Sequence, residues 1–228
     1  MRFEKHSSGW IARRPGLTVF FGNRHSALAE LKAHFPQYRF LRTKQVHGKH
    51  IVEQNFQPTD YEVDADGSWT RTAGFALCAI SADCVPLLIT APGFAMALHA
   101  GWRGVAQRIF VDGLKRAIEA TGDPSKIEIW IGPHIRRESF VVRDDARDLL
   151  QASTALASTQ IIETIGEDQY RIDLEKILRA QAGECGIKDL QIQTLEVDTY
   201  RSEELHSHRR DRENAGRQIS FIVLESIP

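Results

Sequence analysis

CAISADCVPLLITAPGFAMALHAGWRG, residues 78–104, contains two short apolar runs separated by a tight turn. The runs, at 85–90 and 94–100, are bounded by small or polar residues and have the length of buried strands. Only the tripeptide Ala-Pro-Gly at 91–93 separates them, so we expect the two strands to pair as a hairpin. Adjacent antiparallel strands exclude a purely parallel sheet, and we therefore predict mixed sheets.

Similar apolar runs rich in Val, Ile and Phe recur along the rest of the chain and indicate further strands. They lie at residues 17–21, 75–80, 127–132, 190–197 and 219–224. Helical patterns fall between these runs without regular alternation, which favours an α+β fold over a repeated strand–helix unit. The predicted architecture is a layered sandwich of mixed β-sheets flanked by helices.

Two helices can be placed from their spacing and their end signals. Apolar side chains recur at helical intervals from Val105 to a stop near Gly122. A second helix is predicted to begin after Asp173, a residue type that caps helices, and to end at Gly186. Because no repeat or low-complexity linker divides the chain, residues 1–228 are expected to form a single catalytic domain.

The charge balance limits the classes of ligand. The 228 residues include 29 Lys and Arg against 30 Asp and Glu, for a net charge of −1. This balance gives no global attraction to nucleic acid or to an anionic membrane. The amino terminus lacks the apolar segment of a secretory signal, and no run approaches the roughly 20 apolar residues of a membrane span. We therefore expect a cytoplasmic protein that acts on a small molecule.

The cysteines are Cys78, Cys84 and Cys185, and they form no CxxC pair. This argues against a disulfide framework or a structural zinc knuckle. Cys78 and Cys185 are interpreted as buried core residues, whereas Cys84, between Asp83 and Pro86, is expected to act as a thiol or thiolate. Motifs for dinucleotides, for P-loop nucleotides and for zinc nucleobase deaminases do not occur, so those classes lose their usual support.

Three turn-forming segments each carry one reactive side chain: His47, Cys84 and His99. They are too far apart in sequence for a local metal knuckle, so the fold must bring them together. A thiolate and two neutral imidazoles would bind zinc and leave a fourth position open, as in catalytic zinc sites. Without a metal, Cys84 would be a nucleophile with His99 or His47 as its base. The residues support both chemistries.

An anion site is predicted beside His99. The turn at 101–104, Gly-Trp-Arg-Gly, opens the helix expected from Val105, so free backbone N–H groups and the Arg103 guanidinium could bind phosphate. Asp83 is the nearest candidate in sequence for moving protons, and its alternative role is to orient the loop. Further candidates for contact with substrate or phosphate are Gln45, Arg209, Arg210 and Arg217. The three arginines have the alternative interpretation of a solvated basic loop.

Several motifs occur in the order found in one known family. They are QVHG at 45–48, ADG at 65–67, ADCVPLL at 82–88, HAGWRG at 99–104, IGPHI at 131–135 and SHRRDRENAGRQ at 207–218. From about residue 42 onward, the chain resembles the YfiH family. Its members have been called laccase-domain or polyphenol oxidoreductase proteins and are now described as purine nucleoside phosphorylases.

The resemblance implies a zinc ion held by the histidine of QVHG, the cysteine of ADC and the histidine of HAGW, which are His47, Cys84 and His99 here. It also implies phosphorolysis of adenosine, inosine, guanosine and methylthioadenosine, together with adenosine deamination. Some bacterial members are similar to a peptidoglycan editing factor. The implied fold is shared with the catalytic domain of cytotoxic necrotizing factor, a cysteine deamidase.

Two features set this chain apart from what the family names suggest. A multicopper oxidase needs several H-x-H pairs around a cysteine to hold its copper ions, whereas only residues 206–208 have that form. Copper laccase chemistry is therefore not expected. In addition, Asp198 precedes Thr199 where cysteine is common in the family, and His208 stands where tyrosine is common.

We therefore predict a zinc-dependent enzyme that acts on purine nucleosides and phosphate. In phosphorolysis, Arg103 would hold phosphate for attack at the ribose C1′. In deamination, hydroxide would attack C6 of adenosine, with Asp83 as the candidate for moving protons. Two alternatives stay open. One is a cysteine-dependent amidase or peptidoglycan-precursor editing factor, and the other is a non-catalytic binding protein that keeps the three residues for a structural zinc.

Overall fold

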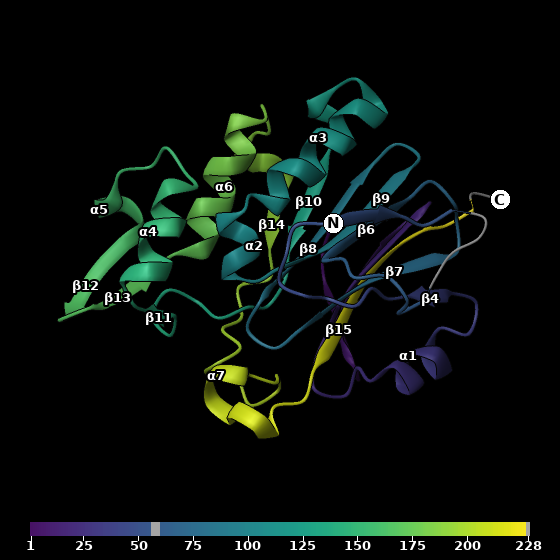
Figure 1. The fold of residues 1–228 in the computed structure, drawn as a ribbon. Helices are drawn as coiled ribbons and strands as arrows, with labels where there is room; N and C mark the ends of the chain where they lie inside the picture. Colours follow the sequence, from purple (N-terminus) through teal and green to yellow (C-terminus); the bar gives the residue numbers. More distant parts are fainter. Residues whose placement is uncertain (56–59, 227–228) are drawn as a thin grey trace.

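The computed structural model describes residues 1–55 and 60–226, and two six-stranded sheets form its centre (Figure 1). The first sheet has the order β1-β2-β3-β15-β7-β4. Its strands are β1 (Glu4–His6), β2 (Gly9–Arg14), β3 (Leu17–Gly22), β15 (Gln218–Leu224), β7 (Phe75–Ser81) and β4 (Arg39–Leu41). All neighbours in this sheet are antiparallel except β4 and β7, which are parallel.

The second sheet contains the hairpin that the sequence predicts. Its strands, in spatial order, are β14 (Ile192–Thr194), β10 (Glu128–Ile131), β8 (Val85–Ala91), β9 (Phe94–Ala100), β6 (Gly67–Thr70) and β5 (Ile51–Glu53). The turn between β8 and β9 is Pro92-Gly93, and Gly93 has a φ of 68°, which glycine adopts without steric cost. Parallel pairs at both edges make this sheet mixed as well, so the predicted fold class is confirmed.

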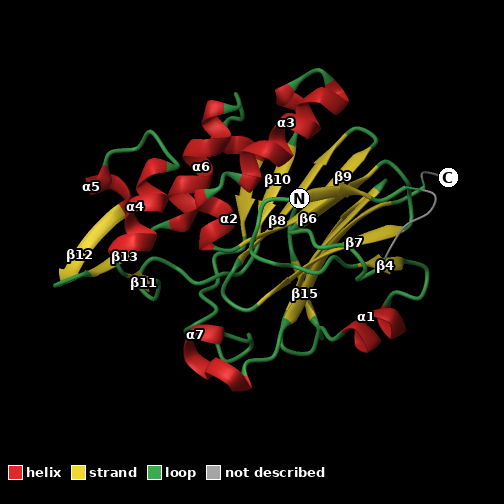
Figure 2. Cartoon of the chain, viewed as in Figure 1, coloured by secondary structure: helices red, strands yellow, loops and turns green. Residues whose placement is uncertain are grey.

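Helices surround the two sheets, and some of them cover the outer sheet faces (Figure 2). They are α1 (Leu28–His34), α2 (Trp102–Ala106), α3 (Ile109–Thr121), α4 (Asp144–Ala152), α5 (Ser158–Ile161), α6 (Leu174–Glu184) and α7 (His208–Asp211). Phe21 and Trp130 belong to the apolar layer between the sheets. Leu114 and Ile177 join α3 and α6 to the other face of the second sheet, while Leu31 joins α1 to the first. The layered sandwich therefore has three apolar layers.

The predicted helix near Val105 needs correction. The helical turns begin earlier, at Trp102, and Arg108 then adopts a left-handed conformation with a φ of 63° that separates α2 from α3. A left-handed residue cannot continue a right-handed helix, and apolar spacing does not reveal such a break. The other predicted helix is confirmed, because the Asp173 side chain accepts a hydrogen bond from the Lys176 N–H at the start of α6.

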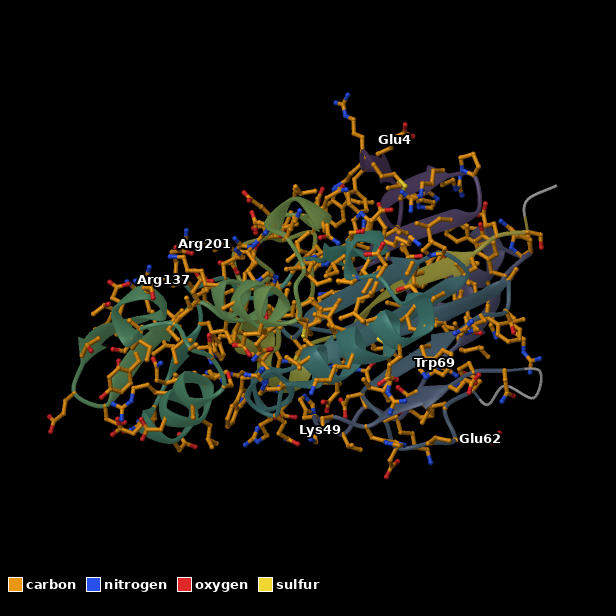
Figure 3. The ribbon with its side chains drawn as sticks, turned by 90° about the horizontal axis from the view of Figure 1, so that it is seen from above. Glu4, Lys49, Glu62, Trp69, Arg137 and Arg201 are labelled. Atoms are coloured by element: carbon orange, nitrogen blue, oxygen red, sulfur yellow. The ribbon has the colours of Figure 1, made fainter. Side chains whose placement is uncertain are left out.

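The remaining regular structure lies around these layers. A small sheet contains β11 (Val141–Val142), β13 (Gln169–Ile172) and β12 (Ile162–Gly166), and 3-10 turns occur at Pro124–Lys126, Asp189–Gln191 and Arg212–Asn214. The strand predicted at 190–197 is shorter in the structure, where β14 covers only Ile192–Thr194. Lys49 and Glu62 project outward from the surface in the view from above (Figure 3). Within the described ranges, every helix is too short or too polar to span a membrane.

Candidate metal centre and substrate cavity

The three predicted ligand residues converge where the chain passes between the two sheets. His47 lies in the loop from β4 to β5, Cys84 in the turn from β7 to β8, and His99 near the end of β9. Their donor atoms all lie within 4.8 Å of one another, and the ring centroids of His47 and His99 are 4.9 Å apart. His99 is buried, Cys84 is partly buried and His47 is exposed. We call these residues the ligand trio.

Gly101 provides the space in which the ligand trio meets. A Cβ atom at this position would lie 3.0 Å from Cδ2 of His47 and 3.1 Å from Sγ of Cys84. These separations are shorter than the optimum for nonbonded contact, so a side chain here would displace both residues. The donor set of one sulfur and two imidazole nitrogens also suits a tetrahedral metal such as zinc. The residues present therefore fit a metal ion.

Cys84 and His99 each favour the charged form of the other. Burial opposes ionisation of the Cys84 thiol, but His99 and His47 outweigh burial and lower the pKa of this thiol to about 6. Burial likewise disfavours the charged imidazole, but Cys84 and Asp66 outweigh it and raise the pKa of His99 to about 9. At pH 7 the pair is therefore thiolate and imidazolium, and a thiolate can bind a metal or attack an electrophile.

Asp66 also contacts this centre, although the sequence analysis gave it no role. Its side chain has no solvent exposure, and Oδ1 accepts a hydrogen bond from Nδ1 of His99 at 2.8 Å. The carboxylate also accepts backbone N–H groups of Val46, His47 and Gly48 at 3.2, 2.9 and 2.7 Å. Burial favours protonation, but these donors hold the pKa of Asp66 below its usual value. The ADG motif was the available signal, since a buried strand rarely begins with an unpaired aspartate.

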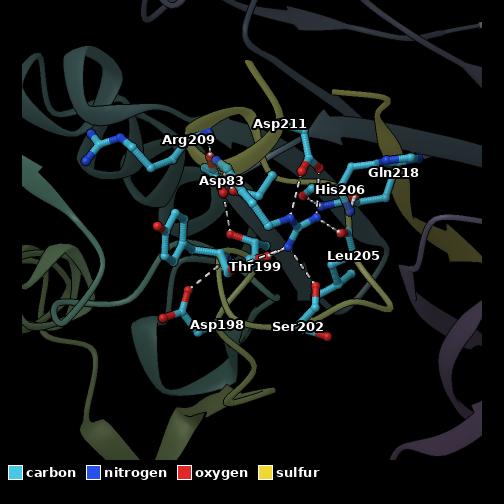
Figure 4. Close-up of polar contacts among 12 residues, drawn as sticks. Asp83, Asp198, Thr199, Ser202, Leu205, His206, Arg209, Asp211 and Gln218 are labelled. Carbon is cyan, nitrogen blue, oxygen red and sulfur yellow. Dashed lines mark hydrogen bonds and ion pairs between the residues drawn. The ribbon is translucent and has the colours of Figure 1, made fainter. Parts of the chain in front are cut away.

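Asp83 stabilises the turn that carries Cys84. Its backbone is left-handed, with a φ of 87°. Oδ1 accepts a hydrogen bond from the Thr199 hydroxyl and Oδ2 accepts one from the backbone N–H of Arg209, both at 2.6 Å (Figure 4). Both oxygens thus make the contacts expected of a residue that orients the loop. A role for Asp83 in moving protons stays a prediction.

A cavity of about 560 Å³ lies beside the ligand trio. Its apolar lining includes Ile80, Trp102, Ile135, Phe140 and Leu174. Three predicted arginines, Arg103, Arg209 and Arg217, also line it, and Asp83 is the one carboxylate among the described residues of the wall. His208, at a position that departs from the family pattern, belongs to the same lining. The cavity therefore combines apolar surfaces with an excess of positive charge.

The other two predicted contact residues make contacts with the protein backbone. Gln45 lines the cavity, but its amide donates to the Ile80 carbonyl at 2.6 Å and accepts from the Ile80 N–H at 2.8 Å, which ties the QVHG loop to β7. Arg210 does not belong to the cavity lining. Its guanidinium holds the preceding loop, and its partners are the carbonyls of Thr199, Tyr200, Ser202 and Leu205 and the carboxylate of Asp211.

The comparison with known families agrees with this geometry. Residues 21–225 match the family described as multi-copper polyphenol oxidoreductase laccase. The chain is also 32% identical over 185 residues to the purine nucleoside phosphorylase YfiH of Escherichia coli K12, covering 79% of this chain and 72% of that protein. The chain belongs to the YfiH family. A second member, the purine nucleoside phosphorylase YlmD of Geobacillus stearothermophilus, is 34% identical over 215 residues, 88% of this chain and 77% of that protein.

A solved structure supports the fold of this YfiH-family chain independently. The crystal structure of the hypothetical protein YfiH of Bacillus licheniformis superposes with a TM-score of 0.90. The two chains share 23% sequence identity, and the alignment covers 98% of this chain and 99% of that one. At this identity, the similarity establishes the fold of the two stacked sheets and their helices.

Proposed function

We propose that this YfiH-family protein is a zinc-dependent purine nucleoside phosphorylase that also deaminates adenosine. The expected substrates are adenosine, inosine, guanosine and methylthioadenosine, with phosphate as the second substrate. The observation that carries the proposal is the opening of the ligand trio onto a cavity with a basic wall. Relatives named as purine nucleoside phosphorylases support the same reaction.

The basic wall supplies the phosphate site. Among the described residues, no salt bridge joins Arg103, Arg209 or Arg217 to a carboxylate. Arg209 and Arg217 each use one guanidinium nitrogen on backbone carbonyls and keep their other N–H donors for an anion. Guanidinium groups bind phosphate through paired N–H donors. The cavity volume, about 560 Å³, lies in the range of small-molecule sites. Its apolar lining would exclude water from a bound nucleoside.

Zinc would be held by His47, Cys84 and His99, and it would supply Lewis-acid chemistry to the bound substrate. In phosphorolysis, Arg103 would orient a phosphate oxygen toward C1′ of the ribose. The new C1′–O bond forms as the bond between C1′ and the purine nitrogen breaks. In deamination, the oxygen of water forms a bond to C6, the bond from C6 to the amino nitrogen breaks, and the amino group leaves as ammonia. We place Asp83 among the residues that position the loop, because both of its oxygens already accept hydrogen bonds.

Copper laccase chemistry lacks structural support in the described part of the chain. Donors suited to a metal gather there in one group, the ligand trio. A multicopper oxidase needs a blue copper site and a separate cluster with several further histidines. The family description therefore gives the family of this chain, but the metal donors in its described residues do not match a multicopper oxidase.

Product analysis tests the proposed reaction. The purified protein is incubated with adenosine in the presence and absence of phosphate, and the products are separated by chromatography. We expect adenine, hypoxanthine and ribose 1-phosphate only with phosphate, and inosine as the product of deamination under both conditions. Arg103→Ala should raise the KM for phosphate, whereas Arg116→Ala, an exposed arginine on α3, should not. A product pattern independent of phosphate would overturn the phosphorylase assignment.

Metal analysis tests the cofactor. Mass spectrometry of the purified wild-type protein should detect bound zinc, and His47→Ala should lose it. Zinc retained at the wild-type level in this variant, or copper in its place, would contradict the proposed centre.

A cysteine-dependent amidase is the second candidate, and the lowered pKa of Cys84 beside His99 favours it. In this reaction the thiolate attacks an amide carbonyl, His99 donates a proton to the leaving amine as the C–N bond breaks, and water then hydrolyses the thioester to release the acid and the thiolate. The two candidates differ in their response to inhibitors. Amide hydrolysis should survive a chelator and be blocked by a thiol alkylator. The zinc-dependent reaction should be lost with the chelator and should resist the alkylator, because bound zinc would occupy the sulfur of Cys84.

A further inference from the structure

We propose that Asp66 is the positioning residue that assembles His47 and His99 for metal binding before a metal arrives. This inference rests on the metal centre of the proposed function and assigns a role to a residue outside the ligand trio. Asp66 precedes β6, and its fully buried carboxylate contacts one ligand through the side chain and another through the backbone.

The first contact fixes the ring of His99. Nδ1 of His99 lies 2.8 Å from Oδ1 of Asp66. An ionised carboxylate can only accept, so Nδ1 must carry a proton, and Nε2 is the ring nitrogen that would bind a metal. The backbone restrains the same pair, because the His99 N–H donates to the Asp66 carbonyl at 2.7 Å. Partners of this kind set the tautomer and ring orientation of ligating histidines.

The second contact fixes the loop that carries His47. Three consecutive backbone N–H groups, at 46–48, point to the two oxygens of Asp66. Successive N–H groups around a left-handed residue form a concave anion site, and His47 has the required positive φ of 60°. The Asp66 N–H also donates to the His50 carbonyl at 2.9 Å. Hydrogen bonds to Asp66 therefore hold the loop both at residues 46–48 and at His50.

Both contacts converge on one side chain, so their effects are coupled. Rotation of the Asp66 carboxylate would release the His99 ring and the His47 backbone together. Cys84 is held separately, because Asp83 anchors its turn to Thr199 and Arg209. Two of three ligands thus share one support, and the third has its own.

Zinc affinity tests the proposal directly. Asp66→Asn keeps the size of the side chain but replaces one acceptor with a donor that faces the backbone N–H groups. The matched control is Asp64→Asn, the same change at an exposed position two residues away. With a chelator as competitor, the Kd for zinc should rise roughly 10- to 100-fold in Asp66→Asn and stay unchanged in the control. Equal affinity in both variants would overturn the proposal.

Two further measurements separate this role from general stability. In metal-free protein, the backbone amides at 46–48 should exchange with solvent faster in Asp66→Asn than in wild type, while the amides of β7 keep their protection. In zinc-loaded wild type, imidazole nitrogen NMR should show the proton of His99 on Nδ1. A proton on Nε2 would overturn the proposal even if Asp66→Asn did not fold. Wild type that fails to bind zinc would instead refute the metal centre, and the amide exchange would still test the loop.

Discussion

Cys78 and Cys84 lie on either side of the end of β7 but in opposite chemical surroundings. Cys78 points into the core around α1, where burial raises the pKa of its thiol to about 12. Cys84 lies in the turn that follows, where His99 and His47 outweigh burial and lower the pKa to about 6. The difference shows that burial does not by itself determine reactivity. The turn makes Cys84 reactive because it leads the chain to two histidines from other segments.

Alkylation of metal-free protein should give the largest contrast between the two cysteines. The thiolate is the nucleophile, and a pKa of about 6 for Cys84 predicts a reaction rate that rises through pH 6 and then levels off. Cys78 should react more than roughly 100-fold more slowly at pH 7. A high pKa makes a thiolate more nucleophilic, but the loss of thiolate fraction at this pH outweighs that gain. Peptide mapping after iodoacetamide treatment measures both sites. Equal labelling of Cys78 and Cys84 at pH 7 would contradict the predicted difference in their reactivity.

The upper pH limit of the pair follows from His99. Its raised pKa of about 9 means that the imidazolium partner is present below that pH and is lost as the pH rises through it. The ion pair therefore exists from about pH 6 to about pH 9. Zinc should suppress alkylation throughout this window by occupying the sulfur.

Replacement of each cysteine by alanine should have different effects: loss of activity at Cys84 and loss of stability at Cys78. Cys84→Ala removes a proposed zinc ligand, so the proposed phosphorolysis should fall by roughly 100-fold or more, beyond the loss typical of an outer partner. Cys78→Ala should keep its activity and lose about 1 kcal/mol of unfolding free energy, as expected for a small core deletion. Steady-state kinetics and urea unfolding of the two variants provide the measurement. Equal loss of activity would mean that the variants act through folding alone.

The smallest change that should affect the surroundings of Cys84, but not those of Cys78, is the addition of one methyl group at Gly101. Gly101→Ala should weaken zinc binding by about 1–3 kcal/mol, the usual cost of overpacking, because the new Cβ would press on His47 and Cys84. Gly183→Ala is the control, since a Cβ there meets no atom within 4 Å. It should leave zinc affinity intact and stabilise α6 by roughly 0.5–1 kcal/mol. Equal affinity in both variants would show that the ligand trio tolerates the extra atom.

The sequence predicted those features that depend on local patterns. The strands of the hairpin follow from two apolar runs around a Pro-Gly turn, and the ligand trio follows from reactive side chains in turn-forming segments together with the family motifs. The helix break at Arg108 escaped detection because the apolar spacing continues across it. The sequence pattern gives Asp66 no role, and it leaves Arg210 with either a contact to substrate or a place in a solvated basic loop. Their hydrogen bonds join segments that only the tertiary fold brings together.

The crossing of the chain between the two sheets has a mechanical consequence. The loop with His47 leads from β4 in the first sheet to β5 in the second, and the turn with Cys84 leads from β7 to β8 in the same direction. A metal bound to both, and to His99 in β9, would act as a cross-link between the two halves of the sandwich. Unlike a disulfide, it would stabilise the folded state by mass action, because the ion binds the assembled site and not the unfolded chain. Separation of the sheets would then require release of the ion, so the metal would lock the sandwich as well as serve its chemistry.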